Sequence, residues 1–379
     1  MIYLDEAATT PVKREVMEAM WPYLGPQFGN PSSHHEVGEA AAQALDQARS
    51  NVADLLSARP SEITFTSGGT ESDNAAVKGI ALAQPRGRHV VMSAVEHPAV
   101  LESAAWLGRI GYDVDELPVD HEGRVRPETL REVIRDDTTL VSVQLANNEV
   151  GTIQPVAELA AIAAEHGVPF HTDAVQAAGW LDLNVDALGV QALGISGHKI
   201  GAPKGIGVLY LKRRTPFEPL IHGGGQQDNR RSGTEPVALA VGMAAALRLA
   251  AADSADVVAR RDAFIARVLS EIPDAELTGH RTERLPGSAS FVFPGRSGES
   301  ILLDLERRGV VCSSGSACAA GSDEPSHVLT AMGYDREVAQ TAVRFTFGRA
   351  TTSEHLDAAA AALAETLVTD VNGVPLRST

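Results

Sequence analysis

The chain has 379 residues, of which 44% are hydrophobic and 21% are charged. These ordinary values suit a globular protein with a sizeable core, and they exclude wholesale disorder, a collagen-like repeat and a coiled-coil rod. The 49 acidic residues outnumber the 32 basic ones and give a formal net charge of −17. This charge argues against broad, charge-driven binding to nucleic acid or to an anionic membrane. At roughly 150 residues per domain, the length suggests about two domains.

Neither the cysteines nor the ends of the chain indicate secretion or a membrane. Cys312 and Cys318 are too few for a disulfide framework, and no Cys/His pattern has zinc spacing. Met1 to Asp5 lacks the basic and apolar regions of a signal peptide, and no stretch approaches the roughly 18 apolar residues of a membrane span. We therefore expect a cytoplasmic protein with no membrane partner, no stable nucleic-acid partner and no metal.

Strand-like and helical patterns alternate over the first 250 residues. Residues 36–56 place apolar side chains every three or four positions, which predicts a helix, and a second helix is predicted at 156–165. Short apolar runs predict buried strands at 63–66, 89–92, 140–145, 169–171, 193–196 and 208–211. Strands that alternate with helices predict an α/β fold whose mostly parallel sheet is flanked by helices.

The pattern changes after Pro236. An alanine-rich stretch runs to Ala252 and is followed by a charged helical pattern. Strands are then predicted at 288–293 and 343–347, and helices at 256–271, 300–308 and 354–367. We predict a large domain over residues 1–250 and a smaller C-terminal α+β domain over 251–379. It stays open whether the first residues pack with the small domain.

Four segments carry side chains suited to chemistry. Thr66–Glu71 combines a strand end, a glycine turn and a helix start, which suits an anion such as phosphate but also an ordinary turn. His97 follows a strand, as a candidate site residue or as a helix cap. Asp173 ends a strand at the sheet edge where catalytic groups gather, although it could as easily cap a helix. Lys199 follows another strand, where desolvation would lower its pKa and suit an imine-forming amine.

Together these segments provide what pyridoxal phosphate needs: a phosphate cradle, a ring partner, an acid for the pyridine nitrogen and an imine lysine. Their order resembles the cysteine desulfurases of the NifS/IscS-like type, in the class-V aminotransferase group of fold-type I PLP-dependent transferases. The resemblance extends from Tyr3 to Arg349. Its most specific matches are Asn30–Ser33, Asn147–Gly151, Ser196–Lys199, Arg231–Thr234 and Ser313–Cys318.

The resemblance implies a homodimeric enzyme that uses pyridoxal 5'-phosphate (PLP) to convert L-cysteine to L-alanine. Lys199 would hold the cofactor as an imine, and Asp173 would pair with the pyridine nitrogen. His97 would stack on the ring and assist proton transfer, while Gln176 would bind the ring hydroxyl. Asn148 would also contact the cofactor. The phosphate group would be held by Gly69, Thr70, Ser196 and His198 of the same chain and by Thr234 of the partner subunit.

The substrate would be held by its carboxylate and attacked by a thiol. The resemblance implies that Asn148 and Arg349 bind the carboxylate, and that Cys318 takes the sulfur as a persulfide for a protein acceptor. A lone cysteine is more often a small buried hydrophobe, but the Ser/Gly-rich residues 313–321 read as a loop. We predict that residues 314–324 are mobile. Cys312 ends a strand-like run and is interpreted as structural.

Several alternatives stay open. Glu6 and Ala319 depart from the usual family pattern, although neither replaces a group with an assigned role. A selenocysteine lyase or another class-V PLP enzyme would share the scaffold, but an aminotransferase needs no mobile thiol. A non-catalytic sulfur-transfer scaffold would have no use for Lys199, Asp173, His97 and Cys318 together. Iron–sulfur cluster assembly, tRNA thiolation and DNA sulfur modification all remain possible destinations of the sulfur.

Overall fold

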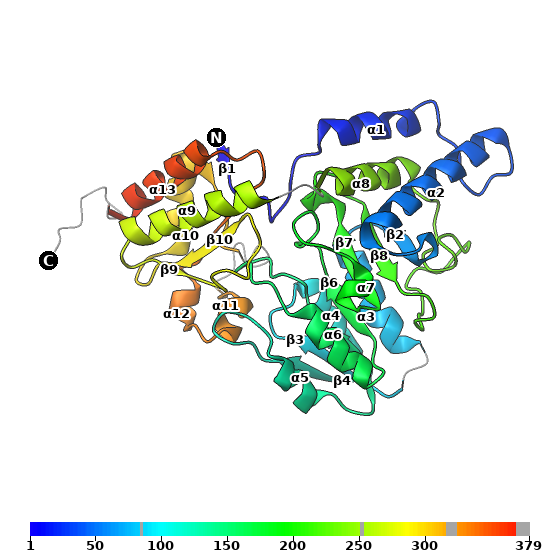
Figure 1. The fold of residues 1–379 in the computed structure, drawn as a ribbon, viewed down its shortest axis with the longest axis horizontal. Coiled ribbons are helices and arrows are strands. Elements are labelled where there is room, and N and C mark those ends of the chain that lie inside the picture. The colour runs from blue at the N-terminus through cyan, green and yellow to red at the C-terminus, as the bar shows by residue number, and fades with distance from the viewer. Residues whose placement is uncertain (84–85, 251–253, 316–323, 369–379) are drawn as a thin grey trace.

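The computed structural model describes residues 1–83, 86–250, 254–315 and 324–368 (Figure 1). Its helices are α1 (Arg14–Leu24), α2 (Glu36–Leu56), α3 (Gly69–Leu82), α4 (Pro98–Arg109), α5 (Pro127–Val133), α6 (Val156–Glu165), α7 (Val185–Leu188), α8 (Val237–Ala250), α9 (Ala255–Glu271), α10 (Gly298–Arg307), α11 (His327–Ala331), α12 (Arg336–Ala339) and α13 (Ser353–Val368). Its strands are β1 (Ile2–Tyr3), β2 (Ile63–Thr66), β3 (His89–Ser93), β4 (Asp113–Leu117), β5 (Thr138–Ser142), β6 (Phe170–Asp173), β7 (Ala192–Ser196), β8 (Gly207–Leu211), β9 (Glu276–Leu277), β10 (Ser288–Val292), β11 (Val310–Val311) and β12 (Val343–Thr346).

A seven-stranded sheet in the order β2-β8-β7-β6-β5-β3-β4 forms the centre of the larger part. Strands β3 to β7 pair in parallel, and β8 is antiparallel to both of its neighbours. Successive side chains point to opposite faces, so Val91 packs into one core with α2, α6 and α8, while Val90 packs into another with α3 and α4. The predicted α/β fold with a mostly parallel sheet between helices is confirmed.

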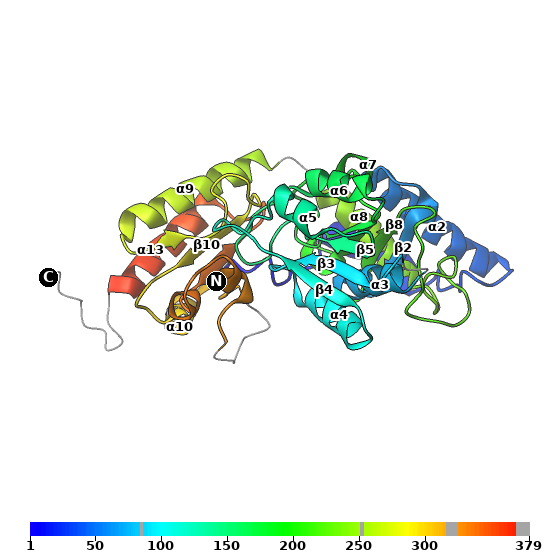
Figure 2. The same ribbon diagram turned by 90° about the horizontal axis from the view of Figure 1, so that it is seen from below.

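The C-terminal part has its own sheets and core. Strands β12, β10 and β9 form a three-stranded antiparallel sheet, and α9, α10 and α13 lie beside it in Figures 1 and 2. Phe264 of α9 makes edge-on contacts with Phe291, Phe345 and Phe347 at its centre. The predicted domain boundary at residue 250 adjoins residues 251–253, which lie outside the described residues, and it stays a prediction.

The N-terminal segment connects the two parts. Strand β1 pairs in parallel with β11, and Leu4 belongs to the C-terminal core. The segment then crosses to the larger part, where the N–H of Thr10 donates to the carbonyl of His198 at 2.8 Å. Within the described residues, no single helix is long and apolar enough to cross a membrane; α8 and α9, bent by 70°, reach that length only as a pair.

Candidate active site

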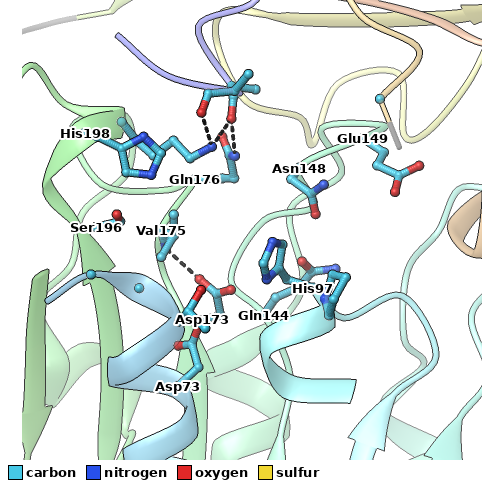
Figure 3. A pocket seen from close by; sticks show the side chains of 18 of the residues that line it. Asp73, His97, Gln144, Asn148, Glu149, Asp173, Val175, Gln176, Ser196 and His198 are labelled. Carbon is cyan, nitrogen blue, oxygen red and sulfur yellow. Dashed lines mark hydrogen bonds between the residues drawn. The ribbon is translucent and has the colours of Figure 1, made fainter. Parts of the chain in front are cut away.

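A cavity of about 730 Å³ opens at the carboxyl ends of the parallel strands (Figure 3). The strand ends point here because parallel strands bring their carboxyl ends to one edge of the sheet. Most of the predicted site residues line this cavity: Gly69, Thr70, His97, Asn148, Asp173, Gln176, Ser196, His198 and Lys199. Thr234 and Arg349 do not line it. No group of three or more His, Cys, Asp or Glu side chains suited to a metal occurs in the described part of the chain.

The start of α3 forms the anion-binding corner of the cavity. Its N-cap, Gly68, has no side-chain cap, so the first N–H groups of the helix are available to a ligand. A Cβ on Gly69 would lie 2.6 Å from Cγ2 of Val175, so only glycine keeps this turn open without displacing its neighbour. Although burial opposes ionisation, hydrogen bonds from Arg231 and Ser67 hold the pKa of Glu71 below its usual range. This corner suits a phosphate group.

Lys199 lies on the short 3-10 turn that follows β7. Its Nζ donates to the carbonyl oxygens of Ala7 and Ala8, at 2.8 Å for Ala8. Desolvation, with the positive charge of Arg344 as a smaller cause, lowers the pKa of Lys199 to about 8. About a tenth of the amine is therefore neutral at pH 7, far more than for an ordinary lysine, and a nucleophilic amine needs this neutral form.

Asp173 ends β6 and lies on the floor of the cavity. Its Oδ1 accepts the N–H of Val175 at 2.8 Å, which closes a local turn and leaves the carboxyl facing the cavity (Figure 3). Burial raises the pKa of Asp173, and the nearby His97 and Lys199 oppose that rise. The structure therefore shows a turn-forming aspartate that also faces the cavity.

His97 is both the N-cap of α4 and a wall of the cavity. Its Nδ1 accepts the N–H of Ala99 at 3.1 Å, so a neutral ring carries its proton on Nε2. Burial lowers the pKa of His97 and favours this neutral form. His198 also lines the cavity, and its Nδ1 lies 3.1 Å from Oγ1 of Thr9. Burial lowers the pKa of His198 to about 4.

The arginine that faces the cavity is Arg344, not the predicted Arg349. The Arg349 guanidinium lies 4.8 Å from the ring centroid of Trp180 and donates to the carbonyl of Gly179 at 3.1 Å. Arg344 is 1% exposed, lines the cavity and donates from Nη2 to Asp5 at 2.7 Å. Its Nη1 donates to the carbonyl of Asn148 at 2.7 Å. A charged residue between the apolar neighbours of β12 was the sequence signal for Arg344.

Of the two cysteines, Cys312 lies among the described residues and Cys318 does not. Cys318 and most of the predicted mobile segment, residues 316–323, lie outside the described residues. Cys312 directly follows β11 and is partly buried against the C-terminal core. Burial raises the pKa of the Cys312 thiol to about 12, so this sulfur stays protonated and is a weak nucleophile.

Comparison with known proteins places these features in a family. A model of the aminotransferase class-V family matches residues 2–359. Cysteine desulfurase IscS of Dictyoglomus turgidum is 49% identical over 361 residues, which cover 94% of this chain and 92% of the relative. Cysteine desulfurase NifS of Azotobacter vinelandii is 45% identical, with coverages of 94% and 90%.

Solved structures agree with the sequence relatives. A NifS-like protein superposes with a TM-score of 0.89 at 36% identity, covering 97% of this chain and 99% of that one. SspA in complex with cysteine gives a TM-score of 0.83 at 37% identity, with coverages of 92% and 99%. The chain belongs to the class-V aminotransferase family of fold-type I enzymes. Within that family it is a PLP-dependent cysteine desulfurase of the NifS/IscS-like type.

The residues of the cavity fit PLP. The uncapped start of α3 suits the phosphate, and Gly69 keeps that corner open. Asp173 offers a buried carboxyl on the floor, and Lys199 offers an amine whose pKa is lowered to about 8. The start of α3 therefore matches the anionic phosphate of the cofactor, Asp173 its protonated ring nitrogen, and Lys199 its aldehyde carbonyl.

The lowered pKa of Lys199 predicts how cofactor attachment depends on pH. Only the neutral amine reacts, so the attachment rate should fall about tenfold per pH unit below pH 8 and level off above it. We would mix apoprotein with PLP, trap the covalent adduct with borohydride at successive times, and correct with N-acetyl-lysine under the same conditions. A rate that keeps rising toward pH 10 would indicate an ordinary, exposed lysine.

Proposed function

We propose that the cavity residues divide the desulfurase reaction among them. Lys199 holds the cofactor covalently and moves a proton at its Nζ, while Asp173 pairs with the ring nitrogen. Bound PLP supplies an electron sink for the negative charge left when a substrate loses its Cα proton. His97 would stack on the ring of bound PLP, and it presents Nε2–H because its Nδ1 accepts the N–H of Ala99. Gln176 binds the ring hydroxyl from the wall of the cavity.

The sulfur step is assigned to Cys318. Its thiolate attacks the sulfur of the substrate, and a sulfur–sulfur bond forms as the carbon–sulfur bond breaks. The electron pair of the broken bond stays on the substrate carbon, which takes up a proton and leaves as alanine. The enzyme keeps a persulfide on Cys318, so one cysteine yields one alanine and one bound sulfur.

The observation that carries this proposal is the meeting of three groups in one cavity. An uncapped helix start, an amine whose pKa is lowered to about 8, and a buried carboxyl come from α3, the turn after β7, and β6. A non-catalytic sulfur carrier needs none of them. Activity on L-selenocysteine, measured beside L-cysteine, separates a selenocysteine lyase from a cysteine desulfurase.

We propose Arg344, with Asn148, as the group that binds the substrate carboxylate, in place of Arg349. Among the described residues, the buried Nε of Arg344 has no hydrogen-bond partner. Its Nη1 donates to the backbone carbonyl of Asn148, which fixes the guanidinium beside the cavity. A guanidinium fork suits the two oxygens of a carboxylate.

Arg344→Lys should raise KM for L-cysteine by about 10- to 100-fold, because lysine keeps the charge opposite Asp5 but loses the fork. Arg349→Lys is the matched control and should change KM by no more than about threefold, since its guanidinium stacks on Trp180. The cofactor spectrum and the melting temperature of each variant report on the fold. If Arg349→Lys raised KM more than Arg344→Lys, Arg349 would be the residue that binds the substrate carboxylate.

We propose that the enzyme is a homodimer. Apolar side chains are exposed along α1 and the segment after it: Met17 (52%), Trp21 (74%), Leu24 (62%) and Phe28 (76%). Such a patch favours a protein interface. Thr234 does not line the cavity of its own chain, which agrees with its supply by a second copy. The mass in solution tests this: a monomer with full activity would contradict it.

We also propose a cytoplasmic enzyme that passes sulfur to a protein acceptor. A persulfide carrier needs a reduced thiol, which a reducing compartment maintains. Candidate destinations are iron–sulfur cluster assembly and nucleic-acid thiolation. The net charge of −17 disfavours stable binding to nucleic acid or to a membrane. Capture with the persulfidated enzyme, followed by identification of the protein that receives the sulfur, tests the acceptor.

A further inference from the structure

A second carboxyl lines the floor of the cavity beside Asp173. Asp73 of α3 is 1% exposed, and its side chain hydrogen-bonds to Asp173. The two residues lie next to each other in Figure 3. A Cβ on Gly194 of β7 would lie 2.3 Å from Oδ1 of Asp73. The sheet therefore has a glycine where this carboxyl needs space.

Within the part of the chain that the structure describes, the groups around Asp73 offer it no positive charge. Its Oδ1 lies 3.5 Å from Nε2 of His171, whose Nδ1 is 2.8 Å from Oγ of Ser142. Burial lowers the pKa of His171 to about 3, so this ring is neutral. The other titratable groups that act on Asp73 are Asp173 and Glu96, and both are acidic.

Two touching buried carboxyls cannot both carry a charge, so the pair holds a proton. Asp173 accepts the N–H of Val175, and the positive charge of Lys199 favours its anion. Oδ1 of Asp73 has no hydrogen-bond partner among the described residues. The proton therefore belongs on Asp73. In agreement, burial and the neighbouring acids raise the pKa of Asp73 well above its usual range.

We propose that Asp73 is a positioning residue whose carboxylic acid donates a hydrogen bond to Asp173 and holds that carboxylate charged and aimed at the ring nitrogen of PLP. This inference rests on the role proposed for Asp173 above. Without the donor, Asp173 keeps only the hydrogen bond from Val175 and the charge of Lys199 against its burial, and the balance shifts toward its protonated form. A protonated Asp173 pairs more weakly with the ring nitrogen.

The test compares Asp73→Asn, which keeps an N–H donor toward Asp173, with Asp73→Ala, which has none. Each apoprotein is titrated with PLP, and the visible absorption of the bound cofactor is followed against pH. We expect Asp73→Ala to weaken PLP binding by about tenfold or more and to shift the midpoint of the absorption change. Asp73→Asn should restore both to within about threefold of the wild type. Wild-type behaviour of Asp73→Ala, or equal damage in both variants, would overturn the proposal.

A second measurement needs neither cofactor nor the alanine variant. The infrared spectrum of the folded wild-type apoprotein should contain a C=O band of a protonated carboxyl that Asp73→Asn removes. Persistence of that band in Asp73→Asn would place the proton elsewhere and contradict the proposal. Asp173→Asn separates the two claims: wild-type PLP binding by that variant would refute the role of Asp173, while the infrared band still decides the state of Asp73.

Discussion

Lys199→Ala is expected to abolish the conversion of L-cysteine to L-alanine. The side chain supplies the protein's covalent bond to the cofactor in the proposed mechanism and the amine that moves a proton, and alanine can do neither. Alanine production and the visible cofactor band would be measured together on purified protein. We expect the band to be lost or replaced by that of a trapped substrate complex.

Lys212→Ala is a suitable control for that experiment. Lys212 follows β8 and does not line the cavity. Its backbone N–H donates to the carbonyl of Gln191 and its carbonyl accepts the N–H of Thr215, and its side chain forms no hydrogen bond or ion pair with another described residue. It should keep wild-type turnover. Unchanged cysteine turnover in Lys199→Ala would refute the assignment of this lysine and the mechanism built on it.

Cys318→Ser should abolish sulfide release while PLP binding stays at the wild-type level. A hydroxyl is a poor nucleophile toward sulfur and cannot carry a persulfide, whereas the cofactor contacts lie on other segments. Release of sulfide in the presence of a thiol reductant, with the cofactor spectrum, measures both effects.

Cys312→Ser is the matched control, since it makes the same replacement of sulfur by oxygen six residues earlier in the chain. Burial raises the pKa of the Cys312 thiol to about 12, and the proposed mechanism gives this residue no role. Activity should persist, with a stability loss of about 1–3 kcal/mol from burying a hydroxyl. If Cys312→Ser lost activity and Cys318→Ser kept it, the nucleophile would be Cys312.

The helices and buried strands with regular apolar spacing could be predicted from the sequence. Residues 36–56 and 156–165 form α2 and α6 with the predicted bounds, because each carries one apolar face. Strand β4 was missed, since this edge strand has the sequence Asp-Val-Asp-Glu-Leu, buries only its last residue and shows no apolar run. The predicted strand at 140–145 is β5, which ends earlier at Ser142. The apolar run continues because Val143 and Leu145 are core residues beyond the strand.

The cavity residues that directly follow strands could also be predicted. Asp173 ends its strand and Lys199 follows one closely, so the topology alone brings them to one edge. Arg344 carries a local signal, a charged residue between apolar neighbours, but its contact with Asp5 joins segments distant in the sequence. Asp73 likewise acquires its role only through its contact with the distant Asp173. The sequence alone could not decide whether Arg344 or Arg349 lines the cavity. The structure shows Arg344 at the cavity and places Arg349 over the ring of Trp180.

The most direct test of the account is a single turnover. Enzyme loaded with PLP would be mixed with less than one equivalent of L-cysteine in the absence of reductant and acceptor, then digested and examined by mass spectrometry. The account predicts one alanine formed per cysteine consumed, and one added sulfur atom on the peptide that contains Cys318. Alanine without added sulfur on that peptide, or sulfur on the peptide of Cys312, would contradict it.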